Sequence, residues 1–151
     1  MMRFFSALNS LIVDILNSLS SVFNLAVRCF VGWQFFQSGL AKVMDWNSTL
    51  SSFQNEYQVP VLTPEHAAMA GAFGELFFPV LLFVGLATRF SAIALSVVNV
   101  VAVIAHKSFL LDPANLAVLQ NHYLWGALLL MLVFYGGGKL TLDYLIHRRW
   151  G

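Results

Sequence analysis

Four apolar segments, each close to the length that crosses a bilayer as an α-helix, dominate the sequence. They run from about Val22 to Met44, Ala67 to Ala87, Phe90 to Ala105 and Leu116 to Gly138. A helix rises about 1.5 Å per residue, so about 20 apolar residues cross the hydrocarbon core. The third segment is short, and we expect its helix to extend through residues 109–111.

The balance of apolar and charged residues supports a membrane location. Hydrophobic residues make up 59% of the chain and charged residues 10%, against roughly 25% charged in ordinary soluble domains. A soluble fold of 151 residues could not cover this much apolar surface, so the excess must face lipid. The sequence contains no run of basic residues of the kind that binds nucleic acid, so nucleic acid is not expected as a partner. The sequence therefore predicts an all-α integral membrane protein built as a four-helix bundle in a lipid bilayer.

The basic residues predict how the bundle is oriented. If both termini are cytoplasmic, the inner face holds Arg3, Arg89, Lys139, Arg148 and Arg149. The outer face then holds only Lys42 and Lys107. Loops rich in Lys and Arg stay on the cytoplasmic side. We therefore expect a multi-pass protein of the inner membrane with its N- and C-termini in the cytoplasm.

Residues 4–24 have a different pattern from the spans. Apolar side chains follow a spacing of three and four residues at Phe5, Leu8, Ile12, Ile15, Leu19 and Val22. Polar side chains follow the same spacing on the other side, at Ser10, Asp14, Asn17, Ser21 and Asn24. This pattern predicts a separate amphipathic helix over residues 1–21, followed by the bundle over 22–151. It would lie on the cytoplasmic interface, or pack against a partner protein or a second copy of the chain.

One stripe of the first span combines charges with small residues. At about 100° per residue, one line on the helix carries Arg28, Gly32, Phe35, Gly39, Lys42 and Trp46. Small residues allow helices to approach closely, and charged side chains avoid lipid. We expect this stripe to face the interior of the bundle.

Glu75 is the only charged residue of the second span. Pro79 lies four residues further on and cannot donate a hydrogen bond to the Glu75 carbonyl. The sequence therefore predicts a kink in this helix, where the Glu75 carboxyl group lies beside a backbone carbonyl that lacks its helical hydrogen bond. The carboxyl group is a candidate for proton chemistry, and it is equally a candidate for a structural partner that holds helices together.

Depth in the membrane suggests which polar groups meet. Lys42 lies about 6 Å and Glu75 about 12 Å inside the outer helix ends, a difference that a lysine side chain covers, whereas Arg28 lies about 27 Å inside. The third and fourth spans add polar groups on their inner faces near the same end. The expected cluster consists of Lys42, Glu75, His106 and His122, with Asn99 deeper.

Three interpretations of this cluster remain open. It could relay protons to a bound quinone, or Glu75, His106 and His122 could bind a metal ion. The histidines could also be simple hydrogen-bonding residues at the interface. The single cysteine, Cys29, has no second thiol with which to run disulfide exchange. Glycines 136–138 are expected to end the fourth span, after which Thr141 or Asp143 begins a short cytoplasmic helix.

Three motifs follow one another along the chain in a distinctive order. The first span reads Arg28-x7-Phe36-x2-Gly39-x2-Lys42. The second reads Glu75 and then Gly85-Leu86-x-Thr88-Arg89, and the fourth ends Gly136-x-Gly138-x2-Thr141-x-Asp143. Over about residues 22–149, their order resembles the DoxX family of small bacterial membrane proteins. The chain departs from that family in having Gly137-Gly138 where a proline is often found, and in its amphipathic N-terminal extension.

The resemblance implies a bundle of four membrane helices in the bacterial inner membrane. The positions that match the family's motifs are Arg28, Gly39, Lys42, Glu75, Arg89 and Asp143. The resemblance also implies association with quinone-linked oxidases or membrane thiol-redox complexes. One hypothesis is therefore a membrane subunit of a quinone- or thiol-linked redox system, with Lys42 and Glu75 as candidate catalytic residues. The alternative is a non-catalytic anchor, scaffold or assembly factor for a partner protein or a metal or peptide maturation pathway. Transport through a homo-oligomer is a third option, and the sequence leaves open whether the protein is an enzyme.

Overall fold

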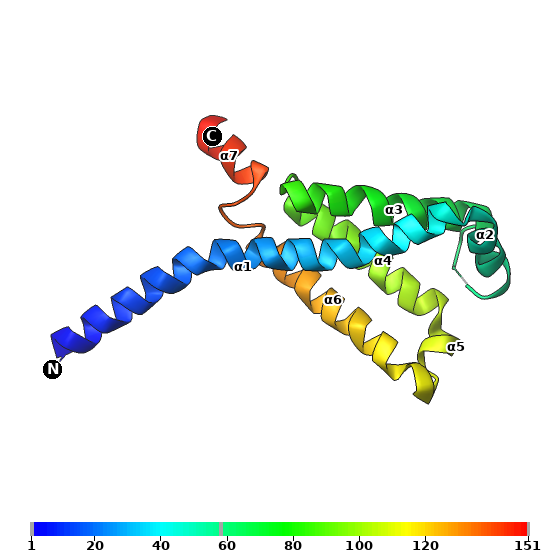
Figure 1. Ribbon diagram of the computed structural model, residues 1–151, viewed down its shortest axis with the longest axis horizontal. Helices are drawn as coiled ribbons and strands as arrows, with labels where there is room; N and C mark the ends of the chain where they lie inside the picture. Colours follow the sequence, from blue (N-terminus) through cyan, green and yellow to red (C-terminus); the bar gives the residue numbers. More distant parts are fainter. Residues whose placement is uncertain (1, 58, 151) are drawn as a thin grey trace.

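The computed structural model describes residues 2–57 and 59–150, with side chains from residue 8 onward, and every regular element in these ranges is helical (Figure 1). The elements are α1 (Met2–Met44), α2 (Trp46–Asn55), α3 (Pro64–Val84), α4 (Thr88–Ala105), α5 (Lys107–Leu110), the short 3-10 helix η1 (Pro113–Asn115), α6 (Leu116–Tyr135) and α7 (Leu142–Trp150). Four of the described helical segments are long and apolar enough to cross a membrane: Leu8–Met44, Pro64–Val84, Thr88–Ala105 and Pro113–Tyr135. The predicted all-α membrane bundle is confirmed.

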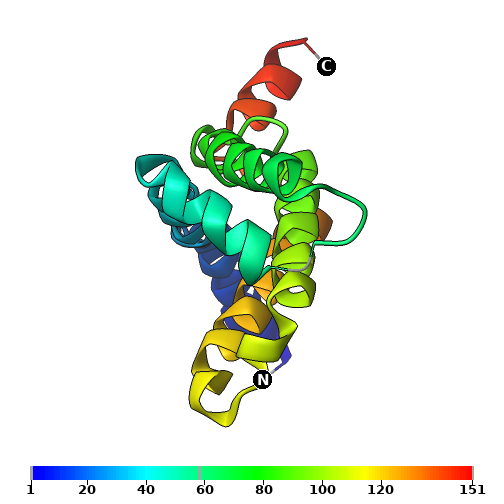
Figure 2. The ribbon, with the colours of Figure 1, turned by 90° about the vertical axis from the view of Figure 1, so that its right-hand side faces the viewer.

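The bundle is built around α3 and α4. Helix α1 packs along α3, and α4 packs against both α3 and α6. Figure 2 looks along the bundle from the end that carries α2. All four long helices contribute to one buried core, which includes Val31, Phe35, Leu82, Leu95 and Leu129. The outward faces instead carry large apolar side chains such as Phe73, Val97, Ile104 and Leu130, an arrangement that suits contact with lipid.

Helix α1 is longer than the first predicted span. The structure joins the expected N-terminal helix and the span into one continuous helix over Met2–Met44. Its N-terminal part projects beyond the other helices (Figure 1). Apolar side chains such as Leu11, Ile15 and Leu19 are exposed there. The location of this part on the membrane interface stays a prediction.

Two local features differ from the sequence expectations. The third span does not continue to residue 111, because α4 ends at Ala105 and a separate helix, α5, begins at Lys107. The backbone of His106 leaves the helical conformation between them, with φ −109° and ψ 24°. The expected polar loop after the first span contains α2, whose N-terminus is capped by Asp45 through a 3.0 Å hydrogen bond from the Ser48 amide.

Gly39 sets the distance between α1 and α3. A Cβ atom at this position would lie 2.9 Å from Glu75 Cβ and 3.0 Å from the Glu75 carbonyl carbon. Atoms of a helix backbone cannot move aside as a flexible side chain can, so only glycine fits without separating the helices. Four residues of the predicted inward stripe are buried in α1, namely Arg28, Gly32, Phe35 and Gly39. The prediction was wrong for Trp46, which is exposed and begins α2 because α1 ends at Met44.

We expect Gly39→Ala to lower the free energy of unfolding by about 1–3 kcal/mol, because the added methyl group overpacks the contact between α1 and α3. Titration with a denaturing detergent would measure this change. Gly71→Ala is the matched control, because a Cβ there would meet only Phe53 Cζ at an ordinary 3.7 Å. Equal stability of the two variants would contradict the proposed close packing.

Candidate functional site

A buried ion pair joins α1 to α3 near the end of the bundle that carries α2, here called the α2 end. Lys42 Nζ lies 2.5 Å from Glu75 Oε2, and it also donates to Ser38 Oγ at 2.8 Å. The Glu75 side chain is 8% exposed and the Lys42 side chain 19%. The lysine thus reaches down α1 to the deeper carboxyl group, as the depths of the two residues predicted. Each charge therefore compensates the other where little water reaches them.

A cavity of about 260 Å³ lies beside this ion pair. Its wall includes the Lys42 side chain together with Asp45, Thr49, Phe53 and Tyr57, from α1, α2 and the segment after α2. Burial raises the pKa of the Tyr57 hydroxyl, and the carboxylates of Glu56 and Glu75 raise it further. Tyr57 therefore stays protonated at neutral pH and can donate a hydrogen bond.

His106 lies on the other side of Tyr57. The two ring centroids are 4.6 Å apart in an edge-to-face contact, and the His106 ring stacks on Phe109 at 4.5 Å. Burial lowers the pKa of His106. The neutral imidazole is therefore favoured at pH 7.

Asn99 and His122 bind each other across α4 and α6. His122 Nδ1 lies 2.8 Å from Asn99 Oδ1, and Asn99 Nδ2 donates to the His122 carbonyl at 3.0 Å. An amide oxygen can only accept, so this geometry requires the proton on His122 Nδ1. The reciprocal pair satisfies both side chains and ties the two helices together.

The five candidate residues thus divide into three contact groups. Lys42 binds Glu75, Asn99 binds His122, and His106 contacts Tyr57 and Phe109. No three His, Cys, Asp or Glu side chains of the described residues come together in a way that could hold a metal ion. Sequence reasoning missed Ser38 and Tyr57. The position of Ser38 one turn before Lys42 was a usable signal, whereas Tyr57 lies in a stretch expected to be loop.

At the opposite end, called the α7 end, Arg28 is fully buried in α1. Its Nη1 donates to the Leu82 carbonyl at 3.0 Å and its Nη2 to the Leu140 carbonyl at 2.5 Å. The last carbonyls of a helix lack helical partners and carry partial negative charge. Arg28 therefore caps the C-terminus of α3 and is not a partner of Glu75, in agreement with its depth.

Asp143 of α7 folds back onto the turn between α3 and α4. Its two carboxylate oxygens accept hydrogen bonds from the Ala87 amide at 2.7 Å and the Thr88 amide at 2.8 Å. Its own amide donates to the Gly85 carbonyl at 3.0 Å. Asp143 thus supplies the missing acceptors for the N-terminus of α4. Gly85 suits this turn because its φ of +70° is strained for other residues.

The remaining family-like positions lie around the same turn. Arg89 Nη2 donates to the Phe134 carbonyl at 3.3 Å. Helix α6 ends at Tyr135, and Gly136 and Gly138 follow with φ of +75° and +76°, so the glycines end the fourth span as predicted. Thr141 Oγ1 accepts from the Tyr144 amide at 3.0 Å and so caps α7. The motifs at this end therefore build a structural junction.

Comparison with known proteins agrees with the motifs. Residues 23–108 match the model of the DoxX family. An uncharacterized protein of Haemophilus influenzae is 36% identical over 140 residues, which cover 85% of this chain and 86% of that protein. No solved structure matches the chain. The family match includes the Lys42–Glu75 pair and Arg28, whereas Asp143 lies outside it.

We expect Asp143→Ala to destabilise the protein by about 2 kcal/mol, because two amides at the start of α4 lose a charged acceptor. Thermal unfolding in detergent would measure the loss. Asp14→Ala is the control, since Asp14 is exposed in the projecting part of α1. A loss no larger than that of the control would show that Asp143 does not hold the junction.

A double-mutant cycle would test the ion pair. Lys42→Met or Glu75→Gln alone should each lower the free energy of unfolding by about 3 kcal/mol, because one charge is left buried without its partner. The double variant Lys42→Met/Glu75→Gln should be more stable than either single variant. Additive losses, measured by denaturant titration, would show that the two groups do not interact.

Proposed function

The chain belongs to the DoxX family of membrane proteins, and from this premise we propose that it is the membrane subunit of a quinone-linked redox system. Its location would be the bacterial inner membrane, with both termini in the cytoplasm. The distribution of basic residues supports this orientation, because Arg89, Lys139, Arg148 and Arg149 belong to the α7 end. The α2 end would then face the periplasm.

The observation that carries the proposal is the buried Lys42–Glu75 pair beside a cavity. Lys42 Nζ and Glu75 Oε2 lie 2.5 Å apart, and the Lys42 side chain also lines the 260 Å³ cavity together with Tyr57. Reduction of a quinone to a quinol takes up two electrons and two protons. A lysine ammonium group and a neutral tyrosine hydroxyl are both proton donors. Once Lys42 has given up its proton, the Glu75 carboxylate would take up a proton from water at the α2 end and pass it to Lys42, and water would likewise reprotonate Tyr57.

The electrons would come from a partner redox protein. The Lys42 and Tyr57 side chains would donate hydrogen bonds to the two carbonyl oxygens of a quinone ring, which gain negative charge as the ring is reduced. Catalysis by this chain would therefore consist of positioning the ring and supplying protons. The assignment makes Lys42 and Glu75 the candidate proton-transfer residues and Tyr57 an additional binding residue.

A thiol-linked version of the same role fits the chain less well. Cys29 is a free and exposed thiol within the membrane span of α1. Exchange between a dithiol and a disulfide needs two thiols, and the sequence contains one cysteine. A quinone, which moves within the bilayer, is therefore the better-supported carrier.

A second candidate function is a non-catalytic anchor or assembly factor for a partner protein. The observation that favours it is the projecting part of α1, where Leu11, Ile12 and Leu16 are exposed. None of the other described helices lies beside this part (Figure 1). Such a surface suits the membrane interface, a partner helix or a second copy of the chain.

Labelling by a photoreactive quinone analogue in proteoliposomes would test the redox proposal. Glu75→Gln and Tyr57→Phe should each reduce the labelling near α2 by about tenfold. Glu75→Gln removes the partner that holds the Lys42 side chain in place, and Tyr57→Phe removes a hydrogen-bond donor to the ring. Glu65→Gln, an exposed carboxylate on α3, is the matched control. Labelling that excess unlabelled quinone does not compete away, or that is the same in all variants, would contradict quinone binding.

The same preparations would separate the two candidate functions. If the protein acts only as an anchor, deletion of residues 2–21 should abolish copurification of the partner, whereas quinone labelling stays absent in every variant. If it acts in redox chemistry, Tyr57→Phe should lower quinone labelling without loss of the partner.

A further inference from the structure

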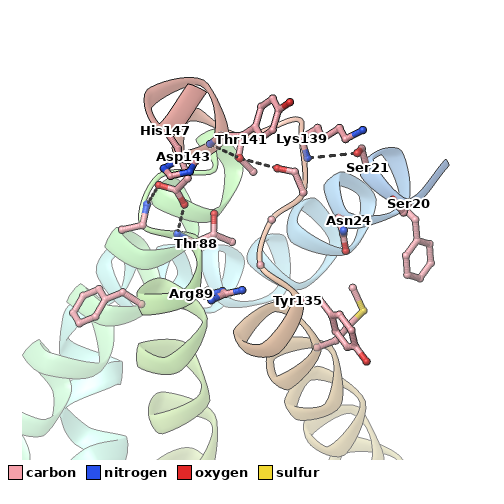
Figure 3. Close-up of a pocket in the computed structure, with 18 residues that line it drawn as sticks. Ser20, Ser21, Asn24, Thr88, Arg89, Tyr135, Lys139, Thr141, Asp143 and His147 are labelled. Carbon is pink, nitrogen blue, oxygen red and sulfur yellow. Dashed lines mark hydrogen bonds between the residues drawn. The ribbon is translucent and has the colours of Figure 1, made fainter. Parts of the chain in front are cut away.

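A cavity of about 1030 Å³ opens at the α7 end of the bundle (Figure 3). None of its lining residues belongs to the ion pair at the α2 end. Its walls come from α1, α4, α6, the glycine loop and α7. We propose that this cavity binds the phosphate head group of an anionic phospholipid. The proposal does not depend on the redox function, because it concerns different residues at the opposite end of the bundle.

The charges around the cavity favour an anion. Arg89 and Lys139 line it, together with His147. The single carboxylate in the lining, Asp143, is already engaged by two backbone amides, at 2.7 and 2.8 Å. The positive charge of the lining is therefore in excess, and the carboxylate does not compete for the two basic side chains.

The Arg89 guanidinium group has N–H donors that can bind a ligand. Only one of its hydrogen bonds is found among the described residues, from Nη2 to the Phe134 carbonyl at 3.3 Å. A guanidinium group has five N–H donors in a planar fork that matches phosphate oxygens. Figure 3 shows the Arg89 side chain reaching from α4 toward the open space, with Asn24 of α1 across from it.

An unpaired buried hydroxyl group provides an independent observation. Thr88 is 1% exposed and lines the cavity, and its Oγ1 has no hydrogen-bond partner among the described residues. A buried hydroxyl without an acceptor is unfavourable, and a bound water, ion or ligand is one way to satisfy it. A phosphate oxygen entering beside the glycine loop would supply the acceptor.

The apolar part of the wall indicates a lipid as the source of the phosphate. The cavity is also lined by Phe23, Phe90, Met131 and Tyr135, from three membrane-spanning helices. Three of these side chains are mostly exposed, at 60% for Phe23, 62% for Phe90 and 78% for Tyr135. Polar and apolar linings therefore meet in one cavity at a helix end, where a phospholipid has its head group above its acyl chains.

Native mass spectrometry of the full-length protein with added phosphatidylglycerol or phosphatidylcholine would test this site. Phosphatidylglycerol should be retained in preference to phosphatidylcholine. Arg89→Gln and Lys139→Gln should each weaken its retention about fivefold, because each removes one charge near the head group. Arg89→Lys should keep most of the binding, since it preserves the charge. Lys107→Gln, a basic residue of the α2 end, is the matched control and should have no effect.

Lys139→Gln keeps the test decisive if Arg89→Gln folds poorly, because only the backbone amide of Lys139 donates a hydrogen bond among the described contacts, to Ser21 Oγ at 3.4 Å. Equal retention of the two lipids, or unchanged binding in Lys139→Gln, would overturn the proposal. Displacement of phosphatidylglycerol by equimolar inorganic phosphate or by its deacylated head group would also overturn it and would assign the cavity to a soluble anion. Failure of both to compete would support the lipid.

Discussion

A charged side chain inside an apolar bundle must have a compensating partner, and the structure meets this requirement twice on one face of α1. Near one end, Lys42 binds the carboxylate of Glu75. Near the other, Arg28 binds the carbonyls of Leu82 and Leu140. At the first position a charge is compensated by an opposite charge. At the second, the charge is compensated by two backbone carbonyls, one in the last turn of α3 and one in the loop before α7. Both tie α1 to α3 along the seam that Gly39 keeps narrow.

The two ends of the bundle therefore differ in what they can do. At the α7 end, Arg28 and Asp143 bind backbone groups, which fixes the turn between α3 and α4 and positions the start of α7. At the α2 end, Lys42 of the ion pair lines a cavity together with Tyr57. The proposed quinone site uses the ion pair at the α2 end. The proposed lipid site uses Arg89 and Lys139 at the α7 end, beside the structural contacts of Arg28 and Asp143.

Features that repeat along a helix could be predicted from the sequence, whereas contacts between helices could not. Periodicity gave the four spans and the buried stripe of α1, and depth along the helices paired Lys42 with Glu75. The Asn99–His122 pair depends on how α4 and α6 pack, and Asp143 caps a helix start 55 residues away in sequence. The break at His106 and the helix after Asp45 depend on local turns that interrupt apolar periodicity. The pattern of α1 also did not reveal that the amphipathic N-terminal part and the membrane span form one continuous helix.

Solid-state NMR in lipid bilayers can measure directly whether Lys42 and Glu75 meet inside the bundle. With ¹⁵N at Lys42 Nζ and ¹³C at the Glu75 carboxyl group, we expect strong dipolar coupling, a carboxylate chemical shift and slow exchange of the ammonium protons with water. Absence of coupling, together with the shift of a protonated carboxylic acid, would show that the two groups are apart and that the pair does not hold α1 to α3.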